Sequence, residues 1–334
     1  MDQVSLGNTG LKVSELSLGT WRFGRRLVDG EERYDEEGIV ETDEERAYEL
    51  LDAYAEAGGN FIDTADKYGD GRAEEWIGNW LEDRDRLDYV VATKIHRPRR
   101  PGDPNGRGLN RRHLRQQIET CLDRLNTDYI DLLYCHRWDD DTPAEEFMRT
   151  LNGFVESGKV NYLGISSGKP DAWKIVKANE IARREGYEPF TVTPPRYSLV
   201  DRAIDANYLP MCRDYGLGVV PWSPLAWGFL TGKYERGDAG HENSTAAEDS
   251  RFADRYLTDE NFAALDVLES VAAEVDATPA QVAIAWQLHH PDITAPIVGA
   301  STVDQLTENL DAAAVSLSDD QFERLSAVKT SGTK

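Results

Sequence analysis

The feature that most constrains the fold is an alternation of short apolar runs with amphipathic segments along the whole chain. Eight such runs lie at LSLGTW (16–21), FIDTA (61–65), YVVATK (89–94), IDLLYCH (130–136), VNYLGISS (160–167), FTVTPP (190–195), GVVPWSP (218–224) and TAPIVGA (294–300). None alternates cleanly between apolar and polar residues, which indicates strands buried on both faces, as in a parallel sheet. The intervening segments predict helices, for example at 43–57, 73–82, 110–125, 144–156, 171–184 and 205–215.

Eight strand–helix units predict an α/β fold, a closed (β/α)8 TIM barrel, with residues 1–334 as one domain. The competing fold is a doubly wound open sheet, which would carry Gly-x-Gly-x-x-Gly after its first strand. No such motif follows LSLGTW. Three pieces lie outside the repeat: a predicted N-terminal β-hairpin in VSLGNTGLKVSEL, an acidic loop at 24–41, and a long loop at 225–256 after strand seven. Connections of that length are often lids or cofactor clasps.

The charge of the chain restricts its partners. Asp and Glu number 61 against 37 Lys and Arg, for a formal net charge of −24, and the acidic residues are spread along the chain. Such a surface repels phosphate, so we expect no nucleic-acid partner. The composition resembles that of proteins from halophilic archaea, whose salt screens self-repulsion, and it predicts a fold that needs high salt.

Targeting and redox signals are absent from the sequence. The N-terminus MDQVSLGNTG is unlike a signal peptide, and no apolar run is long enough to span a bilayer, so we expect a cytoplasmic protein without a membrane partner. Cys121, Cys135 and Cys212 are scattered and form no Cys-x-x-Cys pair, which predicts reduced thiols and no metal site.

Polar residues follow three successive predicted strands at the end where a barrel carries its active site. Asp63 ends the second strand, with Tyr68 in the next loop; Lys94 ends the third and His136 the fourth. Singly, each has a structural interpretation, such as a turn cap, a rim aromatic, a solvent-facing lysine or a buried histidine. Together they are more specific, because a lysine at the end of an apolar strand needs a counter-charge and Asp63 is on the neighbouring strand.

This set of four side chains suits the reduction of a carbonyl group by hydride transfer. The carbonyl oxygen needs a proton donor, and a free tyrosine, with a pKa of about 10, is a reluctant one. A lysine cation beside Tyr68 should lower that pKa, and Asp63 should keep Lys94 charged and aimed. A neutral His136 can orient the carbonyl by a hydrogen bond.

The motifs resemble those of the aldo-keto reductase family from GNTGLKVSELSLGTW to the C-terminal helix. FIDTADKYG, ATK and LLYCHRWD are similar to the family's strand-two, strand-three and strand-four motifs, and the HRWD form is more like the branch of potassium-channel β subunits and related bacterial reductases. The resemblance implies a catalytic tetrad of Asp63, Tyr68, Lys94 and His136. In it, Tyr68 is the general acid/base, Lys94 and Asp63 its tuning pair, and His136 the substrate orienter.

The resemblance also implies a nicotinamide dinucleotide extended over the barrel mouth, with NADP(H) slightly ahead of NAD(H). Ser166 matches a residue that holds the carboxamide, and Tyr197 matches the aromatic that stacks on the nicotinamide. The implied cofactor-binding residues are Gly19, Thr20, Trp21, Asp63, Ser166, Ser167, Tyr197, Trp222, Ser223, Pro224, Leu225, Gly228, Leu230, Lys233, Arg251, Gly299, Ser301, Thr302, Gln305, Glu308 and Asn309.

The sequence departs from the family pattern at two carboxamide positions. Ser167 stands where Asn is common, and Pro194 stands where Gln is common. Pro194 removes a side-chain hydrogen bond, for which Thr193 is a candidate substitute.

A third departure concerns the 2′-phosphate of NADP. Residues 299–309 contain no basic residue, and Thr302 stands where related sequences often carry Arg. Asp304 and Glu308 lie in the same segment and weaken the NADP preference. Lys233 or Arg251 could reach over from the long loop.

The sequence leaves the substrate and the oligomeric state open. Trp21, Arg22, Tyr68, His136 and Trp138 flank the mouth as candidate substrate contacts, and Arg22 hints at an anionic substrate. Two other functions remain. One is a Schiff-base aldolase using Lys94, which the adjacent carboxylate disfavours and borohydride trapping would detect. The other is a cofactor-binding regulatory or interaction protein with little turnover.

Overall fold

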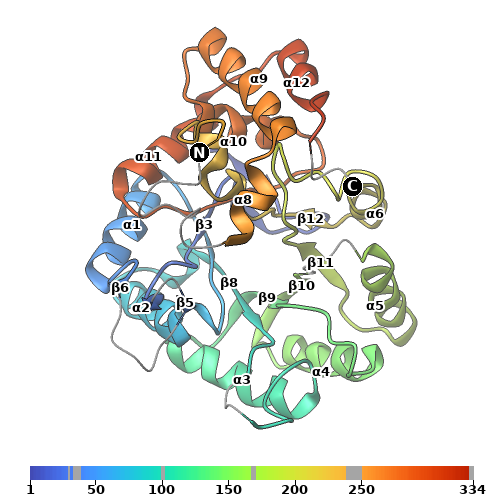
Figure 1. Cartoon of the computed structure of the whole chain (residues 1–334). Coiled ribbons are helices and arrows are strands. Elements are labelled where there is room, and N and C mark those ends of the chain that lie inside the picture. Colours follow the sequence, from blue (N-terminus) through green and yellow to red (C-terminus); the bar gives the residue numbers. More distant parts are fainter. Residues whose placement is uncertain (29–30, 33–38, 99–101, 167–170, 238–249, 331–334) are drawn as a thin grey trace.

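A ring of parallel strands surrounded by helices makes up the body of the molecule (Figure 1). The computed structural model describes residues 1–28, 31–32, 39–98, 102–166, 171–237 and 250–330. Each of the eight strands coincides with one predicted run, and only β8 extends past its run, by one residue. The strands are β3 (Ser17–Gly19), β7 (Phe61–Asp63), β8 (Val90–Ile95), β9 (Ile130–Cys135), β10 (Val160–Ile165), β11 (Phe190–Thr193), β12 (Gly218–Val219) and β13 (Ile297–Val298).

Hydrogen bonds close this sheet into a barrel. The parallel ladder runs β12-β11-β10-β9-β8-β7-β3-β13. Its two edges meet where the Ile297 N–H donates to the Pro221 carbonyl and the Thr294 N–H donates to the Val219 carbonyl, each at 2.8 Å. The predicted closed barrel is therefore confirmed, and the doubly wound open sheet is excluded.

Helices follow the strands as the sequence pattern predicts, with α6 beginning three residues later than predicted. The first six are α1 (Glu44–Glu56), α2 (Arg72–Leu81), α3 (Arg111–Arg124), α4 (Ala144–Glu156), α5 (Ala172–Glu185) and α6 (Tyr208–Tyr215). The C-terminal part adds α8 (Ser250–Tyr256), α9 (Asp259–Val275), α10 (Pro279–His289), α11 (Val303–Asp311) and α12 (Asp319–Ser326). Short 3-10 turns are η1 (Tyr68–Gly71), η2 (Arg86–Asp88), η3 (Ala226–Thr231) and η4 (Ala312–Ala314).

The N-terminal hairpin covers the amino end of the barrel. Its strands β1 (Gln3–Ser5) and β2 (Lys12–Ser14) pair antiparallel, which confirms the predicted hairpin. Leu6 belongs to the apolar cluster inside the barrel, and the Asn8 N–H donates to the Gly216 carbonyl at 2.8 Å. At Gly7, with φ +57°, a side chain would clash with the backbone of Gly218, so only glycine fits there.

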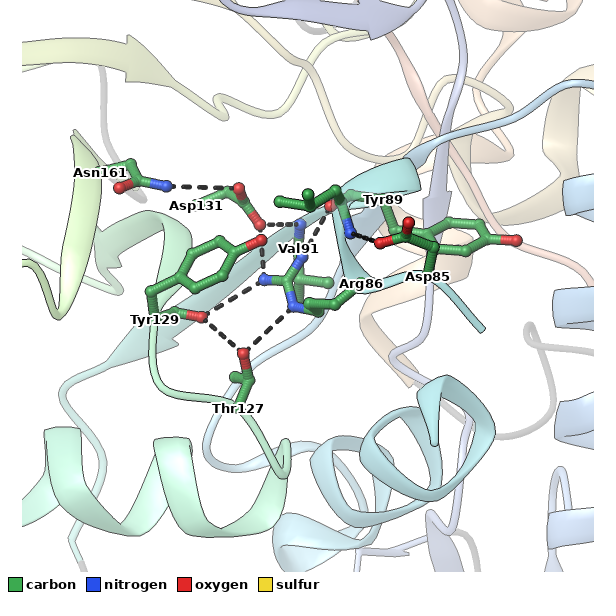
Figure 2. Close-up of polar contacts among 9 residues, drawn as sticks. Asp85, Arg86, Tyr89, Val91, Thr127, Tyr129, Asp131 and Asn161 are labelled. Carbon is green, nitrogen blue, oxygen red and sulfur yellow. Dashed lines mark hydrogen bonds and ion pairs between the residues drawn. The ribbon is translucent and has the colours of Figure 1, made fainter. Parts of the chain in front are cut away.

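A polar network lies at the amino ends of β8 and β9 (Figure 2). The Arg86 guanidinium donates to the Asp131 carboxylate at 2.6 Å and to the carbonyls of Tyr89 at 2.7 Å and Tyr129 at 3.3 Å. The same carboxylate oxygen accepts the Val91 N–H at 3.0 Å. The network ties the connection before β8 to the first residues of β9.

The pieces outside the repeat have structure of their own. The acidic loop contains the short strands β4 (Arg26–Val28), β5 (Glu31–Glu32) and β6 (Ile39–Val40), and the loop after β12 contains η3 and α8. The three cysteines are free and buried. Among the helices of the described residues, none is long and apolar enough to cross a membrane.

Candidate active site

The candidate catalytic residues are the top layer of the barrel interior. Alternate residues of each strand point inward, and the inner apolar cluster contains Phe61 of β7, Ala92 of β8 and Tyr134 of β9. Asp63, Lys94 and His136 each lie two residues further along the same strand direction. The period of two thus brings three polar side chains to one end of the barrel.

Lys94 is the centre of the site. Its ammonium group donates to the Asp63 carboxylate at 2.5 Å, to the Thr64 carbonyl at 2.7 Å and to the Tyr68 hydroxyl at 3.2 Å. The side chains of Lys94 and Asp63 are 4% and 3% exposed, so the pair is shielded from water. Burial alone would lower the pKa of Lys94, but Asp63 and Tyr68 more than offset it, and the pKa is raised. Lys94 is therefore a cation at neutral pH, which disfavours a Schiff-base role.

Asp63 is the counter-charge that the sequence predicts for Lys94. Burial raises the pKa of Asp63, and the adjacent ammonium group opposes this rise. Its second oxygen, Oδ2, is buried and has no hydrogen-bond partner within the described part of the chain. The carboxylate thus retains an unused acceptor at the mouth.

The pKa of Tyr68 differs from the sequence prediction. Burial raises it, and the lowering effect of Lys94 is not enough to reverse the shift. The negative charge of Asp63 adds to the rise. The prediction is right that the interaction with Lys94 lowers the pKa of Tyr68. It is wrong about the overall shift, which is upward because burial has the larger effect. Because Lys94 donates to the hydroxyl oxygen, the Tyr68 proton is left to point toward another acceptor.

His136 stands edge-on to Tyr68, with ring centroids 6.1 Å apart and an interplanar angle of 84°. Burial lowers the pKa of His136 well below its usual value, and Lys94 lowers it further. The ring is therefore neutral at pH 7, as the sequence predicts. Its Nδ1 has no partner among the residues that the structure describes.

Sequence reasoning missed Tyr134. Its ring lies 5.9 Å from the Lys94 ammonium group, and its buried hydroxyl has no partner in the described residues. Burial and the charge of Asp63 raise its pKa well above the usual range. The signal was available, because Tyr134 and His136 are two residues apart on a strand and so face the same side.

Comparisons with known proteins identify the family of the chain. Residues 15–330 match the aldo/keto reductase family. The chain belongs to that family. It is 37% identical over 317 residues to a probable voltage-gated potassium channel subunit beta of Oryza sativa subsp. japonica, covering 93% of this chain and 91% of the relative. An uncharacterized oxidoreductase of Bacillus subtilis is 36% identical over 328 residues, covering 95% and 92%. A norsolorinic acid reductase of Aspergillus flavus is 34% identical over 328 residues, covering 95% and 78%. The chain is an oxidoreductase.

Aldo/keto reductases use nicotinamide cofactors, and several predicted contacts of this chain lie around the mouth. Gly19 ends β3, and the Thr20 hydroxyl donates to the Asp63 carbonyl at 3.0 Å, which ties strand one to strand two. Ser166 follows β10, and its hydroxyl points to the Pro194 carbonyl at 3.5 Å. Ser167 lies outside the described residues.

Two predicted cofactor contacts are wrong, the stacking of Tyr197 on the nicotinamide and the hydrogen bond from Thr193 to the carboxamide. Tyr197 is fully buried in the layer between strands and helices, where it stacks on Trp286 with ring centroids 5.4 Å apart. It has no free face for a nicotinamide. Thr193 also points away from the mouth, because its hydroxyl bonds the Ile165 carbonyl at 2.8 Å and the Tyr208 hydroxyl at 2.5 Å. Trp222 instead is half-buried and packs against the cluster inside the barrel.

The loop after β12 has an unusual backbone. Ser223, Ala226 and Trp227 have φ values of +59°, +49° and +59°, in the left-handed region that non-glycine residues rarely adopt. Such strain is typical of functional loops. A methyl group on Gly228 would lie 3.2 Å from the Lys233 ammonium group, so the predicted loop contacts are close together. Of the others, Leu225 is half-buried, Pro224 and Leu230 are buried, and the side chain of Arg251 lies outside the described residues.

The predicted adenosine-end residues surround the start of α11. The Thr302 hydroxyl accepts the Gln305 N–H at 3.2 Å, and the Gln305 side chain accepts the Ser301 N–H at 3.0 Å. The Asn309 amide donates to the Gly299 carbonyl at 3.3 Å, and Glu308 is half-buried on the same helix. The segment is thus ordered by its own side chains.

The predicted substrate contacts separate into aromatic and charged ones. Trp21 and Trp227 meet edge to face at 5.3 Å, and Trp138 packs on Phe147 of α4 at 5.2 Å. All three indoles are half-buried. Arg22 is paired with the Glu41 carboxylate, which Arg25 also binds. Because Arg22 already has a carboxylate partner, it is a weaker anion site than the sequence suggests.

Proposed function

We propose that this oxidoreductase interconverts carbonyl compounds and alcohols with a nicotinamide cofactor, with Tyr68 as the general acid/base. The observation that carries the proposal is the hydrogen bond from Lys94 to the Tyr68 hydroxyl, inside a buried Lys94–Asp63 pair. A bound cofactor would supply or accept the hydride. In reduction, Tyr68 donates its proton to the carbonyl oxygen, and the fixed Lys94 cation stabilises the phenolate that remains.

The direction of the Tyr68 pKa favours reduction near neutral pH. Because burial raises this pKa, the phenol keeps its proton and is ready to act as an acid. In alcohol oxidation the phenolate must accept a proton, so oxidation should increase as pH rises. Neutral His136 can hold the carbonyl oxygen without adding a charge that would compete with Lys94.

The residues at the mouth fit a nicotinamide cofactor. The unused Asp63 Oδ2 and the half-buried face of Trp222 lie where polar and flat groups are needed. We propose that Trp222, rather than Tyr197, provides the stacking surface. Ser166 and the Pro194 carbonyl would hold the carboxamide, and Lys233 would face a phosphate. We propose a slight preference for NADP(H) over NAD(H), because Lys233 and Arg251 are basic residues that could face the 2′-phosphate.

Aromatic carbonyl compounds are the substrates that we would test first. Trp21, Trp138 and Trp227 form an apolar, flat-sided rim. One relative is named for the reduction of norsolorinic acid. An aryl aldehyde, an aryl ketone and aliphatic compounds of equal size form a matched panel.

A cofactor-binding regulatory protein with little turnover is the second candidate, because one relative is named as a channel subunit. Titration with NADPH and NADH, followed by tryptophan fluorescence and then turnover on the carbonyl panel, separates the two. Binding with turnover supports the reductase. Binding with no turnover supports the regulatory protein, and absence of binding removes both.

We further propose that the protein works in a cytoplasm rich in salt, as one domain without a nucleic-acid or membrane partner. The net charge of −24 supports this, because salt screens the repulsion between acidic groups. The melting temperature should rise between dilute buffer and molar KCl. Equal melting temperatures in both would overturn the salt requirement.

A further inference from the structure

The turn that carries Tyr68 is strained. After Tyr68, the φ values are +59° at Gly69, +57° at Asp70 and +98° at Gly71, so three successive residues are left-handed. Asp70 has a side chain, and residues with a side chain rarely adopt this conformation because the Cβ is crowded by the backbone. A strained turn persists only where its surroundings hold it, so the contacts that fix it also fix the tyrosine.

Arg124, the last residue of α3, reaches this turn from another helix. Its guanidinium donates to the Asp66 carbonyl at 3.1 Å and to the Glu74 carboxylate at 3.2 Å. Two glycines of the neighbouring segment allow Arg124 to approach this closely. A Cβ on Gly78 would lie 2.3 Å from the Arg124 carbonyl, and a Cβ on Gly71 would lie 2.2 Å from its guanidinium carbon. Gly78 lies on α2, and Gly71 is the last residue of η1, directly before that helix.

Glu74 connects the same guanidinium to the lysine strand. Its carboxylate is fully buried, and its other oxygen accepts the Thr93 hydroxyl at 2.6 Å. Thr93 precedes Lys94, and the Asp66 N–H donates to the Lys94 carbonyl at 3.1 Å. Arg124 therefore binds both sides of the Tyr68–Lys94 contact, the turn directly and the strand through Glu74.

We propose that Arg124 is a positioning residue that keeps the Tyr68 hydroxyl within reach of the Lys94 ammonium group. The inference rests on the proposed role of Tyr68 as proton donor. Arg124 touches neither substrate nor reacting atoms and acts through the turn. Its pKa is raised, because Glu74 outweighs the effect of burial, so it stays charged at all pH values of interest.

The test compares Arg124→Met with Arg124→Lys, and with Arg115→Met as the matched control on an exposed position of the same helix. Arg124→Met should lower kcat about 100-fold, the size expected when a reacting group is displaced, while the KM for the cofactor stays within about twofold. The rise of alcohol oxidation with pH should move to higher pH. Arg124→Lys should recover part of kcat, and Arg115→Met should behave as wild type.

Unchanged kcat in Arg124→Met would overturn the proposal. A fall in kcat accompanied by an equally large rise in the KM for the cofactor, with no recovery in Arg124→Lys, would also overturn it, because this pattern would indicate a general loss of structure. If Arg124→Met does not fold, Glu74→Gln and Thr93→Val carry the test, since each breaks one link of the same chain of contacts.

A second measurement needs no turnover. NMR of protein labelled with 13C at the tyrosine ζ carbon, with Tyr68→Phe to assign the signal, reports the environment of Tyr68. The signal should shift or broaden in Arg124→Met and stay unchanged in Arg115→Met. If the wild-type protein reduces no carbonyl, the proposed function fails while this shift still supports the positioning role. An unchanged signal in Arg124→Met overturns the positioning role itself.

Discussion

Two ion pairs stand at opposite ends of one wall of the barrel, the partly buried Arg86–Asp131 pair and the fully buried Lys94–Asp63 pair. They differ in how completely their hydrogen bonds are satisfied. At the amino end, Asp131 uses both carboxylate oxygens, one for Arg86 and Val91 and the other for the Asn161 amide (Figure 2). At the carboxyl end, Asp63 uses one oxygen for Lys94, and the other has no partner in the described ranges. The first arrangement stabilises a fold, whereas the second keeps bonding capacity for a ligand.

The contrast teaches that an ion pair alone does not mark an active site. A buried pair costs desolvation energy, which surrounding hydrogen bonds must offset. Around Arg86 the Thr127 hydroxyl and the Tyr129 ring add to that offset, at 3.3 Å and 4.4 Å. Around Lys94 the added partners are the Thr64 carbonyl and the hydroxyl of Tyr68, a group that can release a proton.

The largest expected effect separates the two tyrosines of these networks. Tyr68→Phe should lower kcat for carbonyl reduction about 1,000-fold, because it removes the proton donor but not the ring. Tyr129→Phe is the matched control and should leave kcat near wild type. Cofactor affinity, followed by fluorescence titration, should change in neither variant. Near wild-type turnover in Tyr68→Phe would remove this residue from the acid role.

The next effect is on stability at the amino end. Arg86→Met should lower the free energy of unfolding by roughly 3 kcal/mol, because it leaves the Asp131 carboxylate buried without its cation. Denaturant unfolding in molar KCl measures this loss, and kcat of the folded fraction should be unchanged. A fall in kcat with unchanged stability would reverse the assignment of the two ends.

Double replacements sharpen the comparison further. Asp63→Asn with Lys94→Met should lower the free energy of unfolding by only about 1 kcal/mol, since both charges leave together and one backbone carbonyl, that of Thr64, loses its donor. The protein should nevertheless lose its activity. Arg86→Met with Asp131→Asn should lower the free energy of unfolding more, because two backbone carbonyls, those of Tyr89 and Tyr129, and the Thr127 hydroxyl lose their donor. Equal effects of the two pairs on unfolding would contradict this contrast.

The smallest effect concerns pH. The pKa of His136 is lowered in the folded state, so below the unfolded-state value of about 6.5 the unfolded chain binds a proton that the folded protein does not. Stability from this group is complete above that pH and is lost as pH falls. The slope is at most about 1.4 kcal/mol per pH unit. His136→Gln should flatten the fall between pH 6.5 and 5 in denaturant titrations relative to Tyr129→Phe.

The sequence was sufficient for the barrel and for the contact between Asp63 and Lys94. Long apolar runs leave a strand no exposed face, and residues that end neighbouring parallel strands meet at one edge of the sheet. The same alternation of side chains would have identified Tyr134, which is two residues before His136 and therefore faces the same side of the strand.

Other features depend on depth and loop path, which local patterns do not encode. The alternation of inward-facing and outward-facing side chains holds only within a strand, and β11 ends before Pro194 and Pro195. The sequence therefore did not reveal that Tyr197 faces the helices. The net direction of the Tyr68 pKa depends on how much protein covers the ring. The partner of Arg22 is Glu41, 19 residues away, and that of the Tyr68 turn is Arg124, 58 residues from Asp66.

The barrel is closed by its two shortest strands, and this has a consequence for its motions. β12 and β13 have two residues each, whereas β8, β9 and β10 have six. Few backbone bonds join the short strands, so amide hydrogens there should exchange with solvent by local opening well before those of β8–β10. Lys94 lies on the slow-exchanging strand β8 and His136 directly follows β9, while Asp63 ends β7, which is bonded to β8, and Tyr68 lies in the turn after β7. The loops that would clasp a cofactor follow the two short strands. A cofactor that must bind and dissociate would thus contact the side of the barrel formed by the short strands β12 and β13, which opens most easily. The catalytic side chains lie on or next to the long strands β8–β10, which open last.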